Sequence, residues 1–165
     1  MNIEKLLSAR NLLEEPTPLS SDCGALCAAA CCAPDEDGQG GMILMPGEAE
    51  LIAAEPWAKL GEGGLIHCGG QCRRAHRPFA CRIFPLAPAL RKDGSFSVRM
   101  DRRALPVCPL AEHGVRGLSP AFVARAREAV ALLASDPEGA EALREWARLE
   151  KQYAKDMEGL RALFG

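Results

Sequence analysis

The sequence has few aromatic residues, no long apolar run and almost no net charge. Two Trp, one Tyr and five Phe make up 5% of its 165 residues, so Leu, Ala, Val and Ile must form most of a core. Apolar runs such as 129–134 are far too short to cross a bilayer, which excludes a membrane-spanning protein. Twenty basic residues against 22 acidic ones give a net charge of -2, which provides no general attraction for nucleic acid or anionic lipid.

A secretory signal is also missing from the first fifteen residues. Glu4, Lys5 and Arg10 interrupt the leucines there, and this pattern is typical of an amphipathic helix. We therefore expect a cytoplasmic protein, and in that compartment disulfides seldom persist. The length fits one domain that can bury a core.

Cysteine is what the sequence does contain: all eight residues of this type lie between positions 23 and 108. The first group is Cys23, Cys27, Cys31 and Cys32. Residues four apart share a helix face, and alanines fill the gaps, so three of these thiols are predicted to line one side of a two-turn helix. Pro34 then predicts a turn that brings Cys32 back towards the same site.

The second group follows a Gly-rich stretch and ends near a proline. It contains Cys68, Cys72 and Cys81, and Cys108 stands alone between two prolines. Gly69 and Gly70 allow a close approach of the backbone to a metal-bound sulfur.

Clustered cysteines in a reducing compartment predict a metal centre rather than a disulfide framework or eight unrelated buried side chains. Thiolates ligate zinc and iron–sulfur clusters alike, so both remain open. Four arginines near the second group are expected to offset the thiolate charge: Arg73, Arg74, Arg77 and Arg82. The histidines beside the cysteines, His67 and His76, are interpreted as solvated or supporting groups more readily than as ligands.

The remaining chain predicts an α-rich α+β fold with minor β structure in one small domain. Residues 1–19 form an N-terminal helix, 20–115 an irregular metal-stapled region, and 116–165 an antiparallel helix pair. The central region contains a polar loop at 35–41, a strand at 42–45, a helix at 47–55 and a hairpin turning at 92–94. Ser119-Pro120 and Asp136-Pro137 mark the two helix starts. The second of these helices has an apolar stripe of Leu143, Trp146, Tyr153, Met157, Leu160 and Phe164.

The cysteine region resembles the YkgJ-type cysteine-cluster family, whose members are described as zinc- or iron-chelating proteins. The segment 77–85, Arg-Pro-Phe-Ala-Cys-Arg-Ile-Phe-Pro, is similar to that family's Arg-Pro-x-x-Cys-Arg-x-x-Pro motif. The first group departs from the family pattern, because three residues separate its cysteines and Ala30 replaces a glycine. The resemblance implies that all eight cysteines are metal ligands. It also points towards proteins described as flagellin lysine N-methylases, although no cofactor signature for that activity is visible here.

The predicted function is therefore metal binding through clustered thiolates, with a structural or metal-handling role. One alternative is a redox or methyl-transfer enzyme that uses a cluster or a reactive thiol. Another is a protein-interaction module that contains a structural metal and binds its partner through the C-terminal helices. Neither nucleic acid nor a membrane is expected as a partner.

Overall fold

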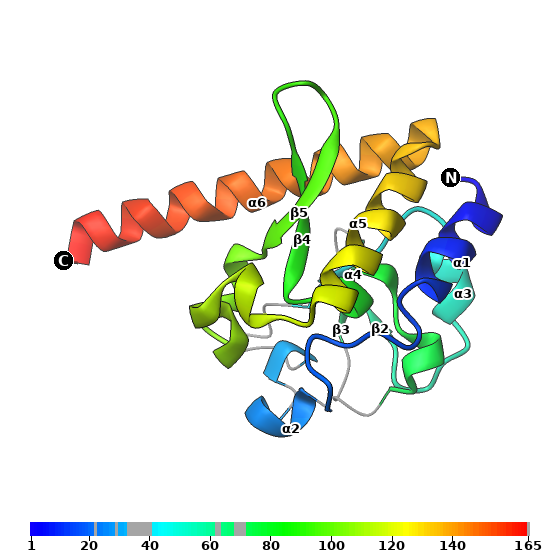
Figure 1. Ribbon diagram of the computed structural model, residues 1–165, viewed down its shortest axis with the longest axis horizontal. Coiled ribbons are helices and arrows are strands. Elements are labelled where there is room, and N and C mark those ends of the chain that lie inside the picture. Colours follow the sequence, from blue (N-terminus) through cyan, green and yellow to red (C-terminus); the bar gives the residue numbers. More distant parts are fainter. Residues whose placement is uncertain (22, 29, 33–40, 62–63, 68–71, 165) are drawn as a thin grey trace.

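A computed structural model describes residues 1–21, 23–28, 30–32, 41–61, 64–67 and 72–164. The chain forms a small α-rich α+β domain, as expected, with two small sheets and a long C-terminal helix (Figure 1). One apolar core joins the N-terminal helix, both sheets and the C-terminal helices. No helix within the described ranges is both long enough and apolar enough to span a bilayer.

The first helix, α1 (Ile3–Asn11), is shorter than predicted. Asn2 caps its start, because the Asn2 side chain accepts a hydrogen bond from Lys5 N at 3.1 Å. Leu6 is fully buried on the face that packs on α4 (Phe79–Ile83) and α5 (Pro120–Ala134). Leu13, beyond the helix, is also fully buried, so the segment that connects α1 to the first cysteines is anchored in the core.

A three-stranded antiparallel sheet follows, in the order β1 (Met42–Ile43), β3 (Leu65–His67) and β2 (Lys59–Leu60). A short helix, α3 (Glu48–Ile52), connects β1 to β2 and corresponds to the predicted helix at 47–55. Gly47 has φ = +90°, which glycine adopts without the steric cost of a Cβ. The predicted polar loop at 35–41 lies mostly outside the described residues.

The predicted hairpin is confirmed as β4 (Leu86–Leu90) and β5 (Phe96–Met100). The two strands pair in register around Pro88 and Val98, and Gly94 takes φ = +82° in the turn. Short 3-10 helices lead from β5 to α5: η4 (Arg102–Ala104), η5 (Pro109–His113) and η6 (Val115–Gly117).

Two C-terminal helices complete the domain, α5 and α6 (Pro137–Phe164). Asp136 caps α6 as predicted, accepting from Gly139 N at 2.9 Å, whereas the Ser119 side chain makes no capping bond. Within the predicted stripe, Leu143 and Trp146 are buried, and Trp146 meets the Phe79 ring edge-on at 6.4 Å. Figure 1 shows the two helices diverging from their joint, with α6 crossing the hairpin and extending past the body of the domain.

Candidate metal centre

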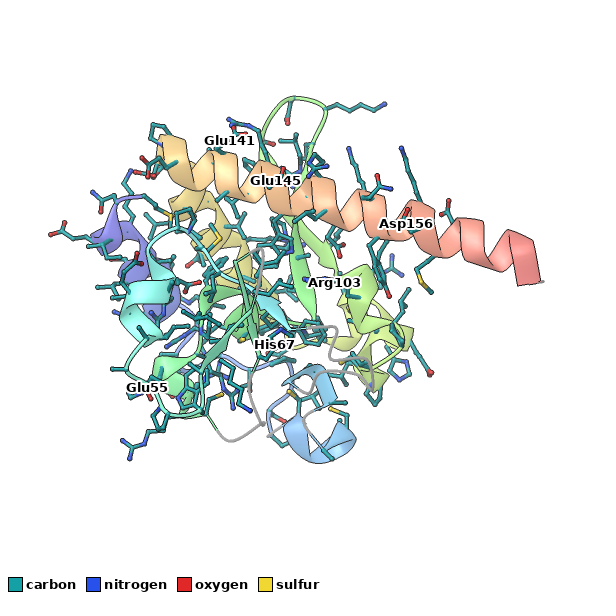
Figure 2. The ribbon with its side chains drawn as sticks, turned by 180° about the vertical axis from the view of Figure 1, so that it is seen from behind. Glu55, His67, Arg103, Glu141, Glu145 and Asp156 are labelled. Carbon is teal, nitrogen blue, oxygen red and sulfur yellow. The ribbon has the colours of Figure 1, made fainter. Side chains whose placement is uncertain are left out.

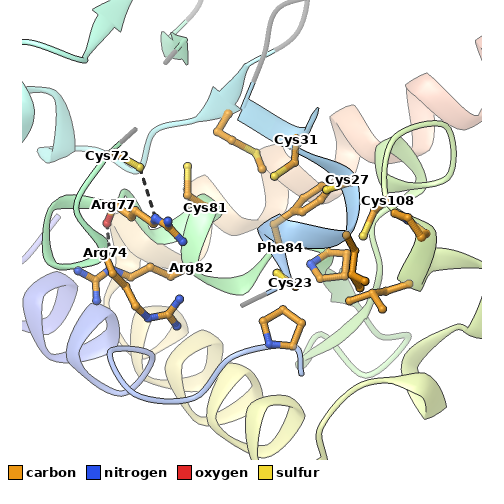
Figure 3. A pocket seen from close by; sticks show the side chains of 16 residues that line it. Cys23, Cys27, Cys31, Cys72, Arg74, Arg77, Cys81, Arg82, Phe84 and Cys108 are labelled. Atoms are coloured by element: carbon orange, nitrogen blue, oxygen red, sulfur yellow. Dashed lines mark hydrogen bonds between the residues drawn. The ribbon is translucent and has the colours of Figure 1, made fainter. Parts of the chain in front are cut away.

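Cysteines from three distant segments line one cavity (Figure 3). All six are half-buried, and the remaining walls are largely apolar, including Leu26, Phe84 and Leu110. The six are Cys23, Cys27, Cys31, Cys72, Cys81 and Cys108. The other two predicted ligands cannot be placed, because Cys68 and the side chain of Cys32 lie outside the described residues.

The first cysteine group does not form the predicted two-turn helix. The helical turn α2 (Gly24–Cys27) ends after one turn, and a separate 3-10 turn, η1 (Ala30–Cys32), follows it. Ala28 between them has φ = +48°, a left-handed conformation that costs a non-glycine residue about 1 kcal/mol. The alanines favour a helix locally, but the chain turns here, and both Cys27 and Cys31 still reach the cavity.

A second, smaller hollow lies beside the cavity and shares three of its thiols. Cys31, Cys72 and Cys81 line it together with Met42, Trp57 and Ile66. Met42 and Ile66 are paired residues of β1 and β3, so the three-stranded sheet supports this end of the thiol set. The sequence predicts a strand at Met42, but no pattern in the sequence indicates that this strand lies beside the cysteines.

Cys108 lies at the opposite end of the cavity, on the turn before η5. Its backbone N–H donates to Ala104 O at 2.7 Å, so the residue is held by η4 on one side and by Pro109 on the other. Burial raises the pKa of the Cys108 thiol, and the nearby Cys27 adds to that rise. Cys27 and Cys108 therefore face each other closely enough to interact, although 80 residues of chain separate them.

The arginines near the second cysteine group differ in the atoms to which they donate hydrogen bonds. Arg74 donates to the carbonyls of Leu13, Glu14 and Pro16, and Arg82 donates to those of Arg10, Ala75 and Arg77. Arg77 instead directs its Nε–H to Cys72 Sγ, at 3.3 Å (Figure 3). Arg74, and Arg82 through the Glu14 carboxylate, therefore also hold the chain after α1 in place, and the countercharge role of the four arginines stays a prediction.

A buried carboxylate that sequence reasoning missed supports the helix that carries Cys81. Glu48 is fully buried and accepts from Met45 N at 2.9 Å and from Phe79 N, the first residue of α4, at 2.7 Å. Burial raises the pKa of Glu48 to about 7, although both bonds and the charge of Arg10, 3.9 Å away, act in the opposite direction. No pattern in the sequence marks this glutamate, because it looks like an ordinary helix-start residue.

His76 contacts a carboxylate and is not among the residues that line the cavity. Its Nδ1 lies 2.5 Å from Glu55 Oε1, and Trp57 Nε1 donates to Glu55 Oε2 at 2.9 Å. The bond to His76 lowers the pKa of Glu55. Figure 2 shows Glu55 at the edge of the domain that carries α3, away from the projecting end of α6. His67 lies in β3 with Gly61 packed against its ring.

The donor chemistry of the cavity fits a soft or borderline metal, since thiolates are the ligands that zinc and iron–sulfur clusters prefer. Among the described residues, no three His, Cys, Asp or Glu side chains lie close enough together to bind one ion. The described thiols thus share a cavity without forming a closed coordination shell.

Comparison with known proteins adds no relative: no protein-family model, curated protein or solved structure matches this chain.

Proposed function

We propose that this chain binds zinc or an iron–sulfur cluster through the thiolates of its central cysteines. The observation that carries the proposal is the convergence of six half-buried cysteines, from three separate segments, on one cavity. Eight cysteines in a chain of this size are poorly explained as small hydrophobic side chains. The resemblance to the YkgJ-type family points to the same function.

Metal–sulfur bonds would stabilise the cysteine region, which has little regular secondary structure. The segments that carry the thiols are short turns and single helical turns, such as α2, η1 and the turn before η5. Joining them through metal–sulfur bonds closes large loops at once, and structural zinc sites contribute on the order of 10 kcal/mol to folding. When bound, zinc would serve chiefly as a structural or transferable ion, and a cluster would add one-electron chemistry.

Purification under anaerobic conditions, followed by metal and acid-labile sulfide analysis, tests the proposal. Iron with sulfide and broad visible absorption indicates a cluster, whereas a colourless protein with stoichiometric zinc indicates a zinc site. Protein that is folded, anaerobic and free of chelator, but holds neither metal and takes up neither on addition, would refute the proposal.

The variant Cys81→Ser gives the residue-level test. It removes a thiol in the middle of α4, and we expect lower metal content and a lower melting temperature. Ala80→Ser is the matched control, because it places the same hydroxyl on the same helical turn at a buried position. We expect the control to lose stability but to retain metal in its folded fraction. Equal metal content in both variants would remove Cys81 from the ligand set.

A further inference from the structure

The contact between Arg77 and Cys72 distinguishes one arginine from its neighbours. We propose that Arg77 is a positioning residue of the metal centre: its guanidinium holds the Cys72 sulfur at the cavity wall and supplies one positive charge to the thiolate set. This inference rests on the proposed metal binding. It adds a group that is not itself a ligand but determines how firmly the ligands hold the metal.

The geometry supports this assignment over the other arginines of the segment. Arg77 Nε lies 3.3 Å from Cys72 Sγ and donates to it, and both residues line the same cavity. Arg74 and Arg82 line the cavity as well, but the hydrogen bonds described for their guanidinium groups go to backbone carbonyls and, for Arg82, also to the Glu14 carboxylate. Arg73 is exposed and is not among the residues that line the cavity.

The chemistry of a thiolate centre calls for such a group. A sulfur bound to a metal keeps lone pairs that accept N–H donors, and these outer contacts orient the ligand. Four thiolates on one divalent ion leave two excess negative charges, and the walls of this cavity are largely apolar. One arginine placed against a ligand sulfur offsets part of that charge where solvent is partly excluded.

The side chain of Arg77 can be changed without removing the contact that its backbone makes. Its carbonyl oxygen accepts from Arg82 Nε at 2.9 Å, and that bond does not depend on the residue type at position 77. The backbone there is extended, with φ = -64° and ψ = 135°, which any residue adopts. An effect of substitution on metal binding would therefore come from the guanidinium.

The test compares Arg77→Gln with Arg73→Gln, which removes an equal charge four residues away. Zinc affinity is measured on metal-depleted, reduced protein by competition with a chromogenic chelator. We expect Arg77→Gln to weaken zinc binding by about 10- to 100-fold, the usual effect of losing an outer contact to a ligand. Arg73→Gln should stay near wild type. Cobalt(II) gives an independent readout, because its thiolate charge-transfer absorption should shift in Arg77→Gln alone.

Each outcome decides the proposal. Wild-type affinity with an unshifted cobalt spectrum in Arg77→Gln overturns the role of Arg77 and leaves metal binding intact. A wild-type chain that binds neither zinc nor cobalt and takes up no iron–sulfur cluster on anaerobic reconstitution overturns the proposed function itself. If Arg77→Gln does not fold, Arg77→Lys replaces it: this variant keeps the charge and loses the planar donor, so a shifted cobalt spectrum supports the proposal and an unshifted one overturns it.

Discussion

The variant Glu48→Gln tests whether the buried carboxyl beside α4 titrates as its surroundings require. Burial raises the pKa of Glu48 from 4.5 to about 7. Between these pH values the folded chain retains a proton that the unfolded chain has released. Stability therefore falls as the pH rises through this window, by about 2 kcal/mol between about pH 5 and about pH 7.5.

Glutamine does not ionise, so this contribution to the pH dependence should vanish in the variant. The amide has one acceptor oxygen for two backbone donors, Met45 N and Phe79 N, and one donor is left without an acceptor. That loss costs about 1–3 kcal/mol. We expect Glu48→Gln to be clearly less stable than wild type at the lower pH and nearly as stable at the higher one.

Urea unfolding at both pH values measures this directly, on reduced protein in the presence of a chelator so that metal binding does not contribute. The carboxyls of lowered pKa, including Asp93 and Asp136, titrate below the window and do not interfere. Glu150 leaves a residual slope in both proteins, because its pKa is also raised to about 7. If wild type and variant show the same change in stability between the two pH values, the reasoning about Glu48 is wrong.

Three further substitutions test the packing around the site. Glu150→Gln should also reduce the loss of stability above about pH 5, because burial and Asp101 raise the pKa of Glu150. Melting temperature is measured against pH, and a profile equal to that of wild type contradicts this prediction. Trp146→Ala should cost about 3–5 kcal/mol in urea unfolding, since the ring is buried; a loss below about 1 kcal/mol would be inconsistent with that burial. Arg74→Gln should cost about 2–3 kcal/mol through its carbonyl partners while metal content per folded chain stays unchanged; lost metal would place Arg74 at the centre.

The elements with strong local signals were predictable from the sequence. Asp136 caps its helix as expected, and the turn at Gly94 joins the two strands of the predicted hairpin. Helical periodicity also predicts the burial of Leu143 and Trp146 in α6, although Tyr153 and Met157 of the same stripe are only half-buried. These features depend on neighbours within a few residues, which is the range over which sequence patterns are informative.

The site was predictable in composition but not in geometry. Cysteine spacing indicates which thiols belong together, and six of them do share a cavity. The turn at Ala28 was not foreseeable, because alanine favours a helix and only contacts with distant segments stabilise the left-handed conformation. The role of Glu48 and the different partners of the arginines were not predictable either. They depend on contacts between residues 30 or more positions apart, such as Glu48 with Phe79 and Arg82 with Arg10.

The placement of Cys108 has a consequence for biosynthesis. During translation the ribosome releases the hairpin after Cys81 and before Cys108, so a nascent chain carries most of its sulfur donors while the wall formed by Pro109 and Leu110 is still missing. Under the proposed function, the thiols of the first two segments are therefore accessible to a metal before the last wall of the cavity has been synthesised.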